Sequence, residues 1–204
     1  KKVIIPMQQH IGAPLTPLVK KGDTVKLGQK IGDSTAYVSS PVHASVSGKV
    51  TAVQPIISVS GAEVMAVEIE PDGLQELHES VVPPVLDDQE SIFNAIRESG
   101  IVGLGGAGFP TAVKLKAPAG KKFDVLVING AECEPYITSD YREMIENTEN
   151  VLEGIKLVMD IAGVEKALIG IEDNKPEAIK KLSECAKKYD NIEVVKLRSR
   201  YPQG

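Results

Sequence analysis

The chain of 204 residues is long enough for one large or two modest domains, and its 25% charged and 42% hydrophobic residues are ordinary for a soluble globular protein. The net charge of −5 at pH 7 and the lack of a basic patch interleaved with aromatic residues argue against a nucleic-acid partner. Every apolar run is far shorter than the roughly 20 residues of a membrane span, so we expect no direct membrane span and no signal peptide.

The first part of the chain, residues 1–77, is predicted to be a small all-β domain. Its β-rich pieces, such as KKGDTVKLGQKIG and SSPVHASVSGKV, are broken at the turn signals KGD, LGQ, VSG and PDG. Short strands with turns at this spacing are typical of a small sandwich or barrel. Residues 78–90 contain paired prolines and several acids, and they form the predicted linker.

Residues 91–204 follow an α/β pattern. Asp87 and Glu90 have the form of a capping box, and the helix that follows is expected to end at Gly100. The expected strands cover 123–129, 167–172 and 192–197, and the expected helices between them cover 138–162, ending at Gly163, and 175–189. This alternation predicts a mostly parallel sheet with right-handed crossovers, whose ligands bind beyond the carboxyl ends of the strands.

The stretch GIVGLGGAGFPT, residues 100–111, contains four glycines in six positions. Such a cluster is costly unless the bare backbone is used, and amides that lead into a helix beginning near Pro110 suit an anion. Lys114 lies one turn further on and could reach a phosphate or a ring carbonyl. Because a helical pattern precedes the stretch, it predicts a phosphate or flavin cradle and not an ordinary dinucleotide turn. A flexible loop without a ligand is the alternative.

A second signal is VINGAECEPY, residues 127–136, at the end of the first expected strand of the α/β region. If the segment is extended, Glu132 and Glu134 point the same way, and Pro135 disfavours a helix at Glu134. Two carboxylates with Asn129 at one strand end predict a site. The alternative is a solvated turn with ordinary surface acids.

These motifs carry a resemblance to a known family. GLGGAGFPTAVKL followed by INGAECEP resembles the NADH- and FMN-binding flavoprotein subunit of respiratory complex I. With KKGDTVKLGQKIG…SGKV ahead of it and RYPQG behind it, the chain is more similar to the C subunits of Rnf electron transport complexes, over essentially its whole length. The resemblance implies a Rossmann-like α/β domain with a glycine-rich FMN loop, preceded by a biotinyl- or lipoyl-like barrel-sandwich domain.

The function implied by the resemblance is that of a ferredoxin:NAD oxidoreductase subunit in an ion-translocating complex. Such a subunit binds FMN and NAD(H), passes electrons to [4Fe-4S] clusters, reaches ferredoxin indirectly, and lies with other subunits on the cytoplasmic side of the bacterial membrane. The clusters are expected outside this chain, which has no C-x2-C-x2-C-x3-C-P pattern. The positions implied to bind the cofactors are Gly103, Gly105, Gly106, Gly108, Phe109, Lys114, Asn129, Glu132, Glu134 and Tyr201.

Individual roles follow from the same resemblance. The glycine backbone lines FMN, which Lys114 and Asn129 contact. Phe109 stacks on the dinucleotide, Glu134 contacts the nicotinamide portion of NADH, and Tyr201 lies near the flavin. Leu104 and Ala131 depart from the complex I form, which has an arginine and an aspartate at those positions.

Two other functions remain open at this point: a cobalamin reductase of a bacterial microcompartment and a non-catalytic docking module. No metal site is expected, because His10, His43 and His78 lie far apart and without ligand spacing, so they are interpreted as surface or satisfied histidines. In the family, further flavin contacts follow the tyrosine segment. We therefore expect a polypeptide ending at Gly204 to lack one wall of the pocket, to be inactive alone and to be isolated without flavin.

Overall fold

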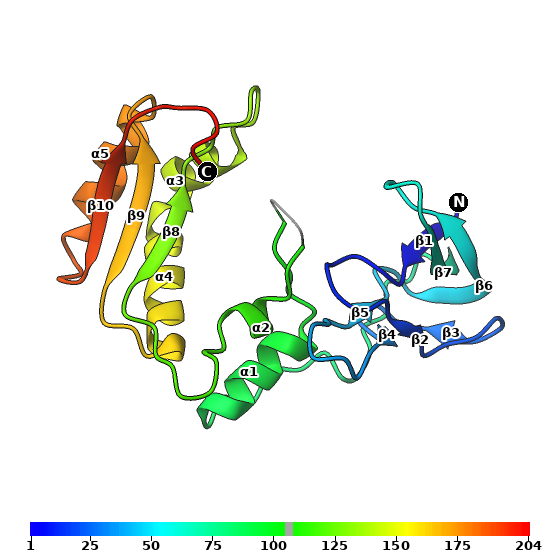
Figure 1. The fold of residues 1–204 in the computed structure, drawn as a ribbon. Helices are drawn as coiled ribbons and strands as arrows, with labels where there is room; N and C mark the ends of the chain where they lie inside the picture. Colours follow the sequence, from blue (N-terminus) through cyan, green and yellow to red (C-terminus); the bar gives the residue numbers. More distant parts are fainter. Residues whose placement is uncertain (105–107) are drawn as a thin grey trace. The chain divides into compact units, whose positions relative to one another are not determined.

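The computed structural model describes residues 1–104 and 108–204, in two compact units, Lys1–Lys116 and Ala117–Gly204 (Figure 1). Each unit has its own hydrophobic core. The predicted linker at 78–90 stays a prediction, and the two helices that follow it belong to the first unit. Gly105 and Gly106 lie outside the described residues. In the described part of the chain, no helix is long and apolar enough to cross a membrane.

The β-rich part of the first unit consists of two antiparallel sheets. The larger has the strand order β1 (Val3–Pro6), β7 (Glu63–Pro71), β6 (Gly48–Ile57) and β3 (Thr24–Val25). The smaller has the order β2 (Thr16–Pro17), β4 (Lys30–Asp33) and β5 (Val42–His43). Alternate residues of the strands, such as Val67 and Ile69, are buried in a core shared with Ile5, Met7 and Ile31.

The predicted turn at VSG shows why a glycine stands there. Gly48 has a φ of +154°, and a Cβ atom at this position would lie only 2.1 Å from the Glu70 carbonyl oxygen of the neighbouring strand. A side chain is therefore excluded by the sheet itself.

Helix α1 (Gln89–Glu98) begins one residue later than the sequence suggested. The capping box is formed by Asp88 and Ser91, not by Asp87 and Glu90: Ser91 N donates to Asp88 Oδ1 over 2.7 Å, and Asp88 N donates to Ser91 Oγ over 3.0 Å. The serine hydroxyl takes the part that a glutamate side chain has in the expected pattern. The expected end at Gly100 is confirmed, since Ser99 is the C-cap.

Charged side chains attach α1 to strand β4. Arg97 donates to Asp33 Oδ1 over 2.7 Å, and Lys30 Nζ lies 3.1 Å from Asp33 Oδ2 and also pairs with Glu98. Burial acts to raise the pKa of Asp33, but hydrogen bonds from Arg97, the Ser34 N–H and Lys30 outweigh it and lower this pKa to about 2. None of the described side chains of α1 is fully buried, and this charged cluster ties the helix to β4 beside its half-buried apolar residues.

The second unit is built on a three-stranded parallel sheet with the order β10 (Ile192–Leu197), β9 (Ala167–Glu172) and β8 (Leu126–Gly130). The predicted parallel sheet is confirmed, although β8 begins three residues later than the expected strand. The connecting helices are α3 (Ser139–Glu146), α4 (Thr148–Ala162) and α5 (Pro176–Ala186).

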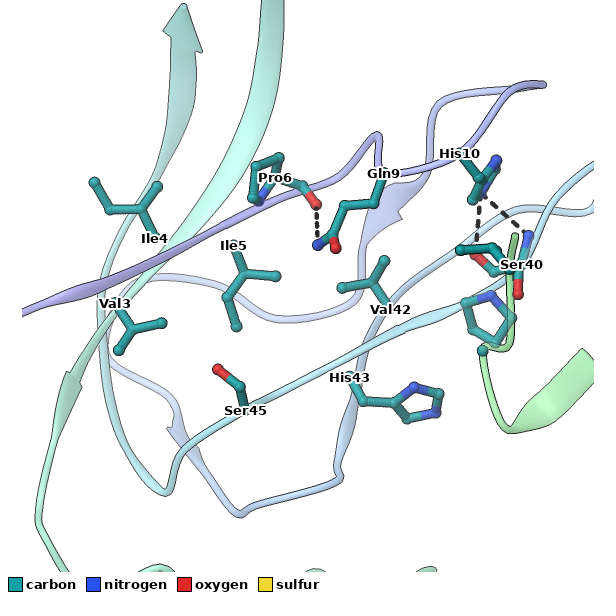
Figure 2. Close-up of a pocket in the computed structure, with 13 residues that line it drawn as sticks. Val3, Ile4, Ile5, Pro6, Gln9, His10, Ser40, Val42, His43 and Ser45 are labelled. Atoms are coloured by element: carbon teal, nitrogen blue, oxygen red, sulfur yellow. Dashed lines mark hydrogen bonds between the residues drawn. The ribbon is translucent and has the colours of Figure 1, made fainter. Parts of the chain in front are cut away.

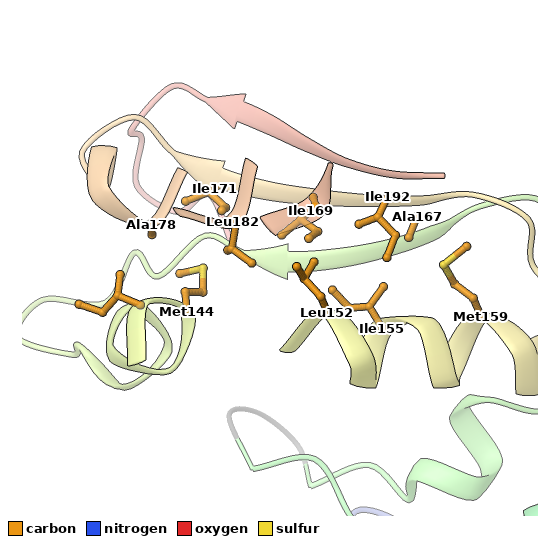
Figure 3. Packing of buried hydrophobic residues seen from close by; sticks show 12 residues of the cluster. Met144, Leu152, Ile155, Met159, Ala167, Ile169, Ile171, Ala178, Leu182 and Ile192 are labelled. Atoms are coloured by element: carbon orange, nitrogen blue, oxygen red, sulfur yellow. The ribbon is translucent and has the colours of Figure 1, made fainter. Parts of the chain in front are cut away.

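The helices of the second unit pack on one face of the sheet. Ala167, Ile169 and Ile171 of β9 point into a core with Leu152 of α4 and Leu182 of α5 (Figure 3). This spacing of two puts the intervening β9 residues on the other face. There, Val127 of β8 is 69% exposed. The sheet thus has one helix-covered face and one open face within this unit.

The single helix expected over 138–162 is wrong, because the chain leaves helical geometry at Asn147 (φ −119°, ψ 34°). The side-chain Nδ2 of Asn147 donates to Glu143 Oε2 over 2.8 Å, and Thr148 Oγ1 donates to the Met144 carbonyl over 2.7 Å. The Thr148 hydroxyl competes in this way for a carbonyl of the helical ladder. The expected end of α4 at Gly163, with a φ of +66°, is confirmed.

Candidate functional site

The glycine segment belongs to the first unit, and its described ends are joined by backbone hydrogen bonds. Gly103 N donates to the Phe109 carbonyl over 3.0 Å, and Thr111 N donates to the Ile101 carbonyl over 3.1 Å. Pro110 is the N-cap of the one-turn helix α2 (Thr111–Lys114), in agreement with the expected helix start. Lys114 is exposed at the end of that turn, and Phe109 is 37% exposed.

The two described glycines of the implied cofactor set have different surroundings. A Cβ atom on Gly108, whose φ is +60°, would lie 3.2 Å from both Gln9 O and His10 Cα, so packing within the protein already requires glycine there. A Cβ atom on Gly103 would meet nothing closer than the Phe109 nitrogen at 3.6 Å. Packing among the described residues therefore does not by itself require glycine at position 103.

A cavity of about 360 Å³ lies beside the residues that lead into the glycine segment (Figure 2). Its lining includes His10, Ser40, His43 and Gly100. His10 is buried and satisfied as predicted: Nε2 accepts from Ser40 N over 3.1 Å, which leaves Nδ1 to donate to the Ile11 carbonyl over 2.9 Å. Burial lowers the pKa of His43. In the described residues, no group of three His, Cys, Asp or Glu side chains could hold a metal ion.

The second unit has a pocket of about 270 Å³ at the carboxyl ends of its three parallel strands. We call it the strand-end pocket; its lining residues are Glu132, Cys133, Glu172, Asn174, Ser199, Arg200 and Tyr201. They lie at or shortly after the ends of β8, β9 and β10. This is where a parallel α/β sheet binds its ligands, as the sequence predicted.

Two buried glutamates line the strand-end pocket. Glu132 is 4% exposed; its Oε1 accepts from Asp140 N at the start of α3 over 2.8 Å, and its Oε2 lies 3.6 Å from Lys175 Nζ without a hydrogen bond. Glu172 is 2% exposed; its Oε1 accepts from Arg200 N over 3.4 Å, and its Oε2 has no partner among the described residues. Each carboxylate thus keeps an unused acceptor, and such buried groups are rare in proteins.

Glu134 has a different environment from Glu132. The strand ends at Gly130, and the chain turns so that Ile137 N donates to the Glu134 carbonyl over 3.3 Å. Glu134 is exposed, whereas Glu132 is buried, so the expectation that the two carboxylates point the same way is wrong. The reason is that the alternation of a strand stops where the strand stops.

The remaining predicted residues of the second unit lie at the same edge of its sheet. Asn129 is exposed, and its Oδ1 accepts from Ala131 N over 3.1 Å. Tyr201 is 76% exposed and lines the strand-end pocket. Its position follows from Ser199, whose N and Oγ donate to Asp173 Oδ1 over 3.0 and 2.7 Å. In Figure 1 this segment (red) runs from β10 across the strand ends toward β8.

The structure therefore brings Glu132 and Tyr201 together in one pocket of the second unit, and it places Gly103, Phe109 and Lys114 in the first unit. Sequence reasoning missed the other polar lining residues of the pocket: Glu172, Asn174, Ser199 and Arg200. A usable signal was present, because all four stand at or just after the ends of predicted strands.

Comparison with known proteins supplies the family. Residues 96–204 match the family described as the Nuo51 FMN-binding domain, and residues 1–74 match the RnfC barrel sandwich hybrid domain. The first match covers more than half of the chain and contains both the glycine segment and the strand-end pocket.

Curated relatives match the chain from end to end. The C subunit of the Na(+)-translocating ferredoxin:NAD(+) oxidoreductase complex of Acetobacterium woodii is 53% identical over 99% of this chain and 46% of the relative. Its proton-translocating counterpart of Clostridium ljungdahlii is 48% identical over 100% of this chain and 45% of the relative. The C subunit of the ion-translocating oxidoreductase complex of Pseudomonas aeruginosa is 43% identical over 100% of this chain and 27% of the relative.

The chain spans about half the length, or less, of these relatives. The barrel sandwich hybrid domain and the FMN-binding domain occur in it in the order that the sequence predicted. The chain belongs to the RnfC family, with an RnfC barrel sandwich hybrid domain followed by a Nuo51 FMN-binding domain.

Proposed function

We propose that this chain is the FMN- and NAD(H)-binding part of an ion-translocating ferredoxin:NAD oxidoreductase, and that it passes electrons between NAD(H) and [4Fe-4S] clusters held outside it. The observation that carries the proposal is the match of residues 96–204 to an FMN-binding domain. The names of the relatives support the reaction and the assembly into a complex. As in the resemblance, we infer a peripheral position on the cytoplasmic side of the membrane, held by other subunits of that complex.

The residues fit such cofactors. Glu132 has a buried acceptor oxygen without a hydrogen-bond partner, and FMN and NADH both carry hydroxyl and N–H donors. Packing among the described residues leaves room for a Cβ atom on Gly103, at 3.6 Å from Phe109 N, so a ligand can approach this backbone closely. Both observations support the binding of a polar ligand.

Bound FMN would connect the two-electron hydride transfer of NAD(H) with one-electron transfers to the clusters. The protein would supply binding, orientation and electrostatics. We propose that the backbone of Gly103, Gly105 and Gly106 lines the flavin, and that Lys114 donates to its phosphate or ring carbonyl. Asn129 and Tyr201 contact the flavin from the strand ends.

Recognition of the nucleotide falls to two exposed side chains. Phe109 offers a flat apolar face for stacking, and Glu134 offers a carboxylate that accepts from the nicotinamide carboxamide. Neither side chain needs to be uncovered by a movement of its own unit, because both are accessible in the structure.

The test is Lys114→Ala in the full-length protein. A hydrogen bond from a charged donor contributes about 1.5 to 3 kcal/mol, so we expect FMN affinity to fall roughly 10- to 150-fold. Retained FMN is measured by absorbance after gel filtration. Lys116→Ala is the matched control, since it removes an equally exposed lysine two positions away. Equal FMN retention in the two variants would contradict the role of Lys114.

A further inference from the structure

We propose that Glu172 is a ligand-binding residue, whose buried carboxylate accepts hydrogen bonds from neutral O–H or N–H donors of the ligand in the strand-end pocket. The proposal rests on the proposed function, and it adds a residue that neither the motifs nor the family resemblance indicated. It also states which part of the ligand lies against this wall of the pocket.

The Glu172 carboxylate is buried with most of its hydrogen-bonding capacity unused. The residue is 2% exposed, its Oε1 accepts one long hydrogen bond of 3.4 Å from Arg200 N, and its Oε2 has none. Among the described residues, no ion pair compensates its charge, whereas Glu132 has Lys175 at 3.6 Å. A buried carboxylate has room for about four hydrogen bonds, and leaving them unmade is costly. A ligand that supplies donors removes this deficit.

Glu172 lies at the strand end that forms the pocket. It is the last residue of β9, the central strand of the sheet, and it lines the same pocket as Glu132 and Tyr201. Along β9, Ala167, Ile169 and Ile171 face the helices, so the alternation directs Glu172 away from that core. Its burial is therefore due to the segment after β10, which carries Ser199 and Arg200 across the strand end.

The charge of the Glu172 carboxylate limits which groups of a ligand can contact it. The described residues offer no metal-binding group of three ligands around the two carboxylates. Charge repulsion disfavours a phosphate in direct contact with the Glu172 carboxylate, although Arg200 also lines the pocket. The neutral donors of a flavin or nucleotide remain: the ribityl or ribose hydroxyls, and the N–H groups of a ring or an amide.

The experiment compares Glu172→Gln with Glu184→Gln, an exposed position on α5, in the full-length protein. Glutamine keeps the shape but turns an N–H group toward the ligand's donors. Binding of FMN, riboflavin, lumiflavin and NADH is measured by fluorescence titration. We expect Glu172→Gln to weaken binding at least tenfold for the ligand that it contacts. Loss for FMN and riboflavin alone indicates the ribityl hydroxyls, loss for all three flavins the ring, and loss for NADH alone the nucleotide.

The stability of the ligand-free protein is the second readout. Because Glu172→Gln removes an uncompensated buried charge, we expect its Tm to equal or exceed that of the parent, whereas a merely structural residue would lower it on replacement. Glu172→Asp, which keeps the charge, should retain more affinity than Glu172→Gln.

Ligand binding by the parent protein distinguishes failure of the proposed function from failure of the inference about Glu172. A parent protein that binds none of the four compounds overturns the proposed function and the inference with it. Binding by the parent with unchanged affinities in Glu172→Gln, or a fall in Tm alongside weaker binding, overturns the inference about Glu172 alone.

Discussion

Glu132 and Glu134 stand two positions apart and carry out different tasks in the proposed function. Glu132 is buried and already holds the first turn of α3 through Asp140 N, so its replacement affects the fold as well as any ligand. Glu134 is exposed, and no side-chain partner holds it among the described residues. It is therefore the better position at which to test ligand recognition.

We predict that Glu134→Gln in the full-length protein lowers kcat/KM for NADH oxidation about tenfold or more while FMN stays bound. In the proposed function this carboxylate contacts the nicotinamide portion of NADH and not the flavin. Steady-state kinetics and the flavin absorbance of the same sample give both quantities. Glu153→Gln, at an exposed position of α4, is the control. Kinetics equal to this control would make Glu134 an ordinary surface acid.

At the scale of single residues, the sequence identified the types of group better than their directions. Glu132 was singled out because it stands in an acidic motif, but its burial depends on where β8 ends and on Lys175, which is distant in the sequence. The sequence places Glu172 at the end of a predicted strand, but it does not show that the side chain is buried there. The Oε2 atom of Glu172 has no hydrogen-bond partner in the described part of the chain, because the segment after β10, which contains Arg200, covers the side chain.

Ion pairs tie helix α1 to β4, and they give this attachment a pH dependence. The carboxyl of Asp33 has a folded-state pKa of about 2, below its ordinary value of 3.8. A depressed pKa contributes stability that is fully present above pH 4 and is lost as the pH falls toward 2. With the side chain 23% exposed, we take the contribution as about 1 to 2 kcal/mol after allowing for solvent screening.

We therefore predict that Asp33→Asn destabilises the first unit by about 1 to 2 kcal/mol at pH 7, and that its difference from the parent shrinks between pH 4 and pH 2. Urea denaturation at several pH values measures the difference, and hydrogen exchange of the α1 amides locates it. Asp87→Asn, an exposed acid of the same unit, should show no such trend. A constant difference across this pH range would show that the Asp33 carboxylate is not the attachment.

At the scale of elements, hydrophobic periodicity predicted the strands and most helices, because burial sets both. The ends were harder. Asn147 and Thr148 interrupt an apolar stripe that continues through both helices, so the pattern alone cannot show the break. The shift of the capping box to Asp88 and Ser91 has a similar cause, since two acids and a serine compete for the same helix start.

For the whole molecule, the position of α1 decides where the first folding unit ends. Arg97 and Glu98 pair with Asp33 and Lys30 of β4, so the contacts of the β domain continue past the predicted boundary at residue 77. We predict that residues 1–116 unfold at a higher urea concentration than residues 1–77, by about 1 to 2 kcal/mol in free energy. Equal midpoints and slopes in the two segments would place the boundary at 77.

The order of the strands also sets how each unit can assemble as the chain is made. In the second unit β8, β9 and β10 are neighbours in sequence as well as in the sheet, so each new strand docks on the one just completed. In the first unit β1 pairs with β7, so that Val3 lies opposite Ile69, which is distant in the sequence. Contacts across such sequence separations form slowly. During synthesis the apolar strand β1 therefore cannot form its native pairing before β7 has left the ribosome, and unpaired apolar strands are prone to misassembly.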